Sequence, residues 1–354
     1  MSADKSELLY VVIHTTMRAT GVRLLPWIAR LLVVAALLVS SCPRLIGAPL
    51  PLKFVADLPL TGNATRLDYE SLDPHSGRLY IAHMGDGAVI VVNTRTRKVE
   101  ATVNHISTVR GVLAIPEMHR VFAASEGNQE VAVIDMRSNR VITRIRAGDV
   151  DGLAFDPITK RAFVSDEAGR REVVIDAMRE RVIGSVALGG EAGNTVYDAA
   201  SHHVFVAVET SNELAEIDPS SLRIISRYPL PGSEHPHGVA VNEKTHFAYV
   251  AGELNASVVA INLRSKKVVA HDGVGIGVDV LSVDSALGRL YVASESGIMT
   301  VFDISDGLFK KVGQWHIAPN AHVVVADPKT HLVYFPLRSV RGKPTLRIME
   351  PLRR

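Results

Sequence analysis

Polar residues of the kinds that bind ligands and metals recur along the chain at nearly constant intervals. One group, called here the first polar set, mixes carboxylate, guanidinium and imidazole side chains at intervals of 41 to 44 residues: Asp68, Arg110, Asp151, Gly193, His237, Asp279 and His322. A second group, the glutamate set, repeats at the same intervals: Met84, Glu126, Glu167, Glu209, Glu253, Glu295 and Arg338. If the fold gathers each set in one place, together they predict a polar and mostly acidic binding site.

The first polar set contains a candidate metal site. Four of its members have side chains that ligate divalent metals: His237, Asp279, His322 and Asp68. Two imidazoles with two carboxylates suit Zn²⁺ or a similar first-row divalent ion. Such an ion could activate water for hydrolysis, with Glu295 or Glu253 as the base. The sequence contains no GxSxG, HExxH or CxxC, so a catalytic nucleophile or a redox pair has no motif support.

A repeat of about 42 residues must position these side chains. Segments such as "SLDPHSGRLYIAH" and "SVDSALGRLYVAS" share an acid, a turn and an aromatic in a β-type run. The acid column is Asp73, Ile115, Asp156, Asp198, Asn242, Asp284 and Asp327. The aromatic column follows seven residues later at Tyr80, Phe122, Phe163, Phe205, Tyr249, Tyr291 and Tyr334. A fixed period of this length indicates a repeat architecture.

Each unit contains four short β-type runs separated by turn residues, which predicts a four-stranded antiparallel blade. Seven units of this kind predict an all-β, seven-bladed β-propeller. The seventh unit has only three runs, at residues 323–327, 332–337 and 345–350. "KFVADLPLTG" (53–62) aligns with the fourth run of the fourth unit, "RIISRYPLPG". We therefore expect the N-terminal strand to complete the last blade and close the ring.

The strand order of a propeller places both polar sets at one face of the ring. The first polar set precedes the innermost strands and should encircle one mouth of the central channel, with the glutamate set around it. Their combined charge predicts a negative potential that favours cations. Two interpretations stay open for the first polar set. Its members bind a ligand or a metal, or they hydrogen-bond neighbouring blades and channel water. For the glutamates, solvated hairpin tips are the alternative.

The repeats resemble those of the YVTN-type, YncE-like seven-bladed propellers, which are bacterial and exported. "HPHGVAVNEKTHFAYVAGELNASVVAIN" (235–262) carries the resemblance best, and the likeness extends over residues 52–352. It implies the propeller fold. It also implies a choice among functions, because related propellers bind single-stranded DNA, serve as surface or scaffold modules, or act as metal-dependent lactonases. The site must therefore be argued from its own residues.

The first 48 residues are predicted to be a leader, and residues 49–354 a single propeller domain. "LLVVAALLV" (31–39) is too short to span a bilayer but suits the apolar core of a signal peptide, with arginines before it. Met17 is the expected true start. "VSSC" ends at the only cysteine, Cys42, and resembles a bacterial lipobox; cleavage near Ala48 is the alternative. The mature protein is expected in the periplasm or elsewhere outside the cytoplasm, with lipidated Cys42 as its candidate membrane anchor.

Composition narrows the classes of partner. The formal net charge is +2 and only 5% of residues are aromatic, so a groove for nucleic acid is not expected. We predict a monomeric binding or scaffold module whose channel mouth contacts a small ligand or a periplasmic protein. A metal-dependent, lactonase-like hydrolase is the first alternative, with a divalent ion as its candidate cofactor. Single-stranded DNA binding is the second.

Overall fold

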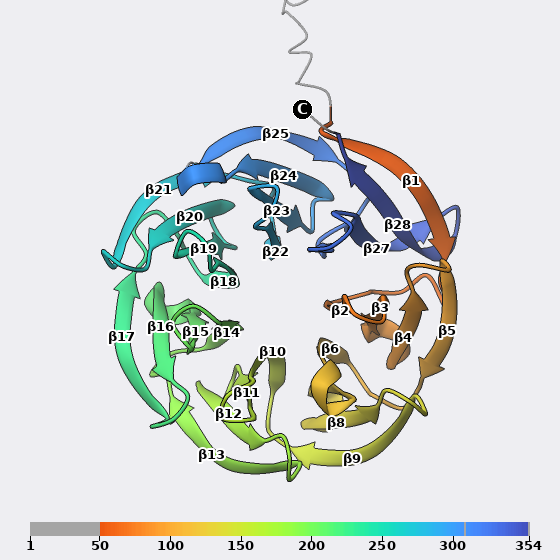
Figure 1. Ribbon diagram of the computed structural model, residues 1–354, viewed down its shortest axis with the longest axis horizontal. Helices are drawn as coiled ribbons and strands as arrows, with labels where there is room; N and C mark the ends of the chain where they lie inside the picture. Colours follow the sequence, from red (N-terminus) through yellow and green to blue (C-terminus); the bar gives the residue numbers. More distant parts are fainter. Residues whose placement is uncertain (1–49, 308, 353–354) are drawn as a thin grey trace, which may run out of the picture. The chain divides into compact units, whose positions relative to one another are not determined.

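The computed structural model describes residues 50–307 and 309–352, which fold as a ring of seven four-stranded antiparallel sheets (Figure 1). The predicted seven-bladed β-propeller is thereby confirmed. The expected leader, with Met17, Cys42 and Ala48, lies outside the described residues. Within the described part of the chain, no helix is long and apolar enough to cross a membrane.

Six blades are formed by consecutive strands, which run in order from the channel to the outside. Blade 1 contains β2 (Glu70–Asp73), β3 (Arg78–His83), β4 (Ala88–Asn93) and β5 (Lys98–Val103); blade 2 contains β6 (Val109–Ile115), β7 (Arg120–Ser125), β8 (Glu130–Asp135) and β9 (Arg140–Arg146). Blade 3 contains β10 (Val150–Asp156), β11 (Arg161–Asp166), β12 (Arg171–Asp176) and β13 (Arg181–Ala187). Blade 4 contains β14 (Ala192–Asp198), β15 (His203–Val208), β16 (Glu213–Asp218) and β17 (Arg223–Pro229).

The remaining blades follow the same order. Blade 5 contains β18 (Pro236–Asn242), β19 (Phe247–Gly252), β20 (Ser257–Asn262) and β21 (Lys267–Gly273); blade 6 contains β22 (Val278–Asp284), β23 (Arg289–Ser294), β24 (Ile298–Asp303) and β25 (Lys310–His316). Blade 7 contains β26 (Val325–Ala326), β27 (Val333–Val340), β28 (Lys343–Pro351) and, outermost, β1 (Leu52–Pro59). Single 3₁₀ turns lie at hairpins: η1 (Met84–Asp86), η2 (Pro116–Met118), η3 (Glu126–Asn128), η4 (Glu209–Ser211) and η5 (Ser305–Gly307).

The N-terminal strand closes the ring as predicted. β1 pairs antiparallel with β28, from Leu52 opposite Pro351 to Pro59 opposite Thr345, so the two ends of the described chain lie side by side (Figure 1). The Arg347 guanidinium donates to both carboxylate oxygens of Asp57 at 2.9 and 2.8 Å, which adds a link across this pair. The inner strand β26 is shorter than expected: residues 321–324 do not continue the strand, and the His322 carbonyl accepts a hydrogen bond from the Val280 amide of blade 6.

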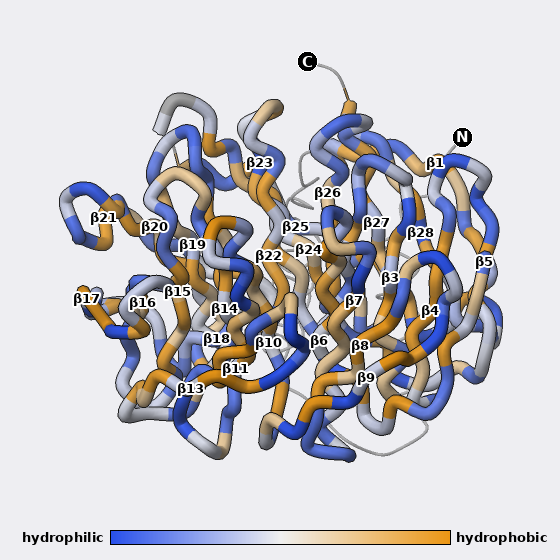
Figure 2. Tube along the Cα trace, turned by 60° about the horizontal axis from the view of Figure 1, so that its bottom comes forward, coloured by the Kyte–Doolittle hydropathy of each residue, from blue (hydrophilic) through white to orange (hydrophobic). Residues whose placement is uncertain are grey.

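The repeated columns have structural roles that explain the period. All seven members of the aromatic column are at most 1% exposed, so each contributes a core side chain to its blade. The acids of the acid column accept hydrogen bonds from backbone amides two or three residues later, as Asp156 does from Ile158 and Thr159. This arrangement is the Asx turn that Asp and Asn favour. In Figure 2 the hydrophobic segments follow the strands within the blades.

A buried carboxylate lies between blades 3 and 4. Glu172 on β12 is fully buried, and its Oε1 lies 2.9 Å from the Ser165 hydroxyl, which is also 2.6 Å from the Gly193 carbonyl. One hydroxyl proton can serve only one of these acceptors, and a proton on Glu172 satisfies the other. Burial accordingly raises the pKa of Glu172 well above its usual value.

Because β1 closes the ring, substitutions of its buried and exposed residues should differ in their effect on stability. Leu52 is 5% exposed and packs in the core of blades 6 and 7, whereas Phe54 on the same strand is 54% exposed. We expect Leu52→Ala to lower the free energy of unfolding by about 2–4 kcal/mol, and Phe54→Ala by less than about 1 kcal/mol. Urea denaturation measures both. Equal effects would contradict a stabilising contribution of the buried face of this strand to the closed ring.

Glu172 predicts a pH dependence of stability. Because its pKa is raised in the folded state, the folded protein holds this proton where the unfolded chain has lost it, so stability falls as pH rises above about 4.3. Melting temperatures between pH 5 and 8 should therefore fall less steeply in Glu172→Gln than in the wild type. Glu350→Gln, at an exposed site, is the control and should retain the wild-type slope. An unchanged slope in Glu172→Gln would contradict the assignment.

Candidate functional site

The two polar sets meet at one mouth of the channel, where they line a cavity of 320 Å³. Five residues of the first polar set line it, Asp68, Arg110, Asp151, His237 and Asp279, and five of the glutamate set, Met84, Glu167, Glu209, Glu253 and Glu295. Four other residues complete the lining, Arg66, Tyr69, His235 and Gly277, whereas Gly193 and His322 of the first polar set lie outside it. We call this cavity the channel mouth. A larger, more apolar cavity of 490 Å³ lies between blades 6 and 7 and has no comparable cluster of charges.

Local irregularities in the inner strands present the first polar set to the channel. In blades 2 to 6 the pairing of the first and second strands shifts register at this set, as between Val150 and Leu153 around Asp151. Such bulges re-aim a side chain. Glycine follows the set in blades 2, 3 and 5, and a Cβ on Gly238 would lie 1.9 Å from the Asp279 carbonyl oxygen. The inner strands of neighbouring blades are therefore packed backbone against backbone at this level.

Two members of the predicted sets lie at the edge of the channel mouth. Glu126 does not line the cavity, but its carboxylate accepts a hydrogen bond from Arg110 at 3.1 Å. Arg338 is exposed, and its Nε donates to the Ala64 carbonyl at 3.3 Å. The Arg110 guanidinium also pairs with Glu167 at 3.0 Å and lies 3.7 Å from Asp151. These contacts tie blades 2 and 3 together at the mouth.

Tyr69 crosses the channel, and sequence reasoning missed it. It comes from blade 1, yet its hydroxyl lies 3.1 Å from His237 Nε2 and donates to Asp279 Oδ1 at 3.1 Å. Asn194 of blade 4 also donates to this hydroxyl. Burial and the nearby acids raise the pKa of Tyr69 well above its usual value, so the hydroxyl keeps its proton. The corresponding positions in blades 2, 3 and 5 are Gly111, Gly152 and Gly238. A tyrosine at a position that is otherwise often glycine was the sequence feature that could have identified Tyr69.

His237 is held as a cation between several acids. Its Nδ1 lies 2.6 Å from Glu209 Oε1, and its Nε2 lies 3.7 Å from Asp279 and 3.9 Å from Asp151. Burial alone would lower the pKa of His237, but the Glu209 hydrogen bond and the carboxylates of Asp279 and Asp151 raise it to about 10. Burial raises the pKa of Asp151 to about 7, with Asp68 and Asp279 adding to the rise.

Two further basic residues, Arg66 and His235, lie close to the acids of the channel mouth. Arg66 pairs with Glu295 at 2.6 Å, and its guanidinium lies 3.6 Å from Asp68 and 3.9 Å from Asp279. His235, which sequence reasoning also missed, lies 3.4 Å from Glu209 and 3.5 Å from Glu253. Both lie two residues before a member of the first polar set, at a position where the residue type changes from blade to blade, so no repeated residue type marked them.

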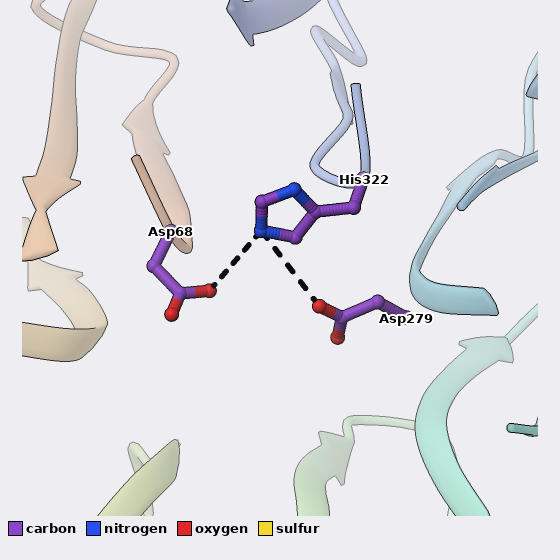
Figure 3. A group of neighbouring side chains, drawn as sticks. All are labelled: Asp68, Asp279 and His322. Atoms are coloured by element: carbon purple, nitrogen blue, oxygen red, sulfur yellow. Dashed lines mark ion pairs between the residues drawn. The ribbon is translucent and has the colours of Figure 1, made fainter. Parts of the chain in front are cut away.

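The candidate metal residues are only partly grouped. Ligand atoms of Asp68, Asp279 and His322 all lie within 4.8 Å of one another, and these residues come from three neighbouring blades (Figure 3). Their charges favour a protonated or metal-bound imidazole: burial alone would lower the pKa of His322, but Asp68 and Asp279 raise it. The fourth predicted ligand, His237, contacts Asp279, but both its ring nitrogens already face hydrogen-bond partners. Glu191, Glu209 and His235 form a second, more exposed group within the same distance.

Comparison with known proteins identifies the fold and no family. No protein-family model matches the chain, and no curated protein matches it. Among solved structures, the Kuenenia stuttgartiensis hydrazine synthase is similar, with a TM-score of 0.70 and 16% sequence identity over 86% of this chain and 97% of that chain. At this identity the similarity supports the propeller fold alone, and function must come from the channel mouth.

The position of Tyr69 predicts a specific loss of stability. Tyr69→Phe would leave Asp279, His237 and Asn194 without their shared hydroxyl partner, and we expect it to lower the free energy of unfolding by about 1–3 kcal/mol. Tyr197→Phe is the matched control, because that hydroxyl does not line the channel mouth and forms an exposed hydrogen bond with His202. Chemical denaturation of both variants measures the difference. A loss in Tyr69→Phe no greater than in Tyr197→Phe would contradict a cross-channel role.

Proposed function

We propose that the chain is a binding module that holds a small cationic ligand in the channel mouth. A propeller fits such a module, because its inner strands converge polar side chains from all blades on one place. The observation that supports a cationic ligand is the lining of the cavity. Seven carboxylates face it, from Asp68, Asp151, Glu167, Glu209, Glu253, Asp279 and Glu295, against two arginines and two histidines.

The excess of carboxylates sets the sign of the potential. Low-dielectric walls concentrate the field of grouped charges, so a cation gains more in this mouth than at an open surface. The volume of 320 Å³ is at the lower end of the range for small-molecule sites, which suits a compact ligand such as a short organic amine. The exposed carboxylates of Glu253 and Glu295 stand at the rim, where they would meet the ligand first.

The same contacts argue against phosphate backbones as ligands. Arg66 and Arg110, the arginines that line the cavity, are each paired with glutamates at 3.1 Å or less. A phosphate would have to displace these carboxylates and would remain close to the others. Single-stranded DNA binding, which the YncE-like resemblance implies as one choice, is therefore less favoured than cation binding. We retain the proposal that the protein acts outside the cytoplasm, on the basis of its predicted leader.

Titration with spermidine tests the proposed function, with glutarate as an anion of comparable size. Isothermal titration calorimetry should show spermidine binding that weakens between 50 and 200 mM salt, and no comparable glutarate binding. Glu253→Gln should raise the spermidine Kd about fivefold, which corresponds to ~1 kcal/mol. Glu117→Gln should leave it unchanged, because Glu117 is equally exposed, at 45%, but lies at the opposite face. Glutarate binding as tight as that of spermidine would contradict the proposal.

A further inference from the structure

We infer that Asp68, Asp279 and His322 bind one divalent first-row transition-metal ion at the wall of the channel mouth. These residues come from blades 1, 6 and 7, and blades 7 and 1 meet where β1 joins the last blade and closes the ring. The inference deepens the proposed function and rests on it for the access of ligands through the mouth. It differs from that function because it names a bound metal ion instead of an organic cation, and the absence of metal binding would leave the proposed function intact.

His322 is the residue on which the inference depends. Its side chain is 1% exposed, and its Nε2 has no hydrogen-bond partner in the described chain. Its other nitrogen, Nδ1, lies 3.0 Å from the backbone carbonyl of Asn320 and therefore carries the proton of a neutral ring. That assignment leaves the Nε2 lone pair directed at the two carboxylates (Figure 3). A buried nitrogen without a partner is costly, and a metal ion would satisfy it.

Both carboxylates present one oxygen to this nitrogen. Asp68 Oδ1 lies 3.7 Å from His322 Nε2 and, like it, is buried without a hydrogen bond. Asp279 Oδ2 lies 3.9 Å from the same nitrogen. The second oxygen of each carboxylate is already engaged: Asp279 Oδ1 accepts from Tyr69 at 3.1 Å, and Asp68 Oδ2 lies 3.6 Å from the Arg66 guanidinium. Outer partners of this kind orient metal ligands.

The spacing suits an ion held by these three atoms. Ligand atoms about 2.1 Å from a tetrahedral ion lie roughly 3.4 Å apart, so the distances of 3.7 and 3.9 Å need to shorten by a few tenths of an ångström. One imidazole with two carboxylates suits Zn²⁺ or Mn²⁺, whereas Mg²⁺ and Ca²⁺ prefer oxygen ligands alone. Three protein ligands leave at least one coordination position free for a ligand that enters the mouth.

Two neighbouring cations compete with this arrangement. Arg66 lies 3.9 Å from Asp279 Oδ2, although its charge is shared with Glu295 at 2.6 Å. His237 does not join the ligands, because its nitrogens contact Glu209 and Tyr69. If the three residues instead formed a simple ion cluster, a protonated His322 would lie between the carboxylates and no metal would bind. Direct measurement of the metal separates these two arrangements.

The test uses residues 49–354, purified without a polyhistidine tag and without chelator. Elemental mass spectrometry should find about one equivalent of a transition metal, or calorimetry should show one-to-one binding of Zn²⁺ or Mn²⁺ to the chelator-treated protein. Co²⁺ should give visible absorption bands that depend on His322. His322→Asn and Asp279→Asn should lose stoichiometric binding. Tyr69→Phe, which frees Asp279 from its outer partner, should weaken binding roughly 10–100-fold.

The controls separate this site from others. His235→Asn removes the histidine of the second candidate group and should bind the metal as the wild type does. Circular dichroism confirms that each variant is folded before its metal content is compared. The inference is overturned if the folded wild type binds neither Zn²⁺ nor Mn²⁺, if His322→Asn retains full binding, or if His235→Asn abolishes it. Spermidine binding that persists in His322→Asn would show that the proposed function stands without the metal.

Discussion

The pairing of β1 with β28 is the interaction on which both the fold and the candidate site depend. It supplies the outer strand of blade 7, covers an open sheet edge and brings the first and last units together. Only the eight residues 60–67 then separate Pro59, at the outside of blade 7, from Asp68 and Tyr69 at the channel. The segment that closes the ring therefore also delivers the carboxylate that meets His322 and the hydroxyl that crosses the channel.

The channel mouth is a place where the fold tolerates charges that are costly to bury. Bulges direct side chains of the first polar set inward, and close packing of the inner strands keeps them there. The charges offset one another in part, since Arg66 and Arg110 each pair with glutamates and His237 is held between acids. Carboxylates remain in excess, and the buried nitrogen of His322 and an oxygen of Asp68 stay without hydrogen bonds. A surplus of this kind is typical of functional sites, where local stability is given up for binding.

Much of the fold could be predicted because the residues that each blade requires recur in successive repeats of the sequence. The buried aromatics and the Asx turns each occupy one column, so their period gave the blades and the extra strand at the N-terminus. The two polar sets were also columns, and their convergence at one mouth followed from strand order. Tyr69 and His235 escaped because their residue types are not repeated at the equivalent positions of the other blades. The metal set was predicted with four members, whereas the structure gathers three and commits His237 to Glu209 and Tyr69.

The sequence by itself determined the seven blades, the closing strand and the face on which the polar residues gather, because these follow from local propensity and a regular period. Only the tertiary structure decided which of those residues touch. Contact across a channel depends on side-chain length, on small shifts of strand register and on the residues opposite, and none of these is fixed by spacing along the chain. Tyr69 illustrates the difference: it meets residues 125, 168 and 210 positions away along the chain, in blades 4, 5 and 6.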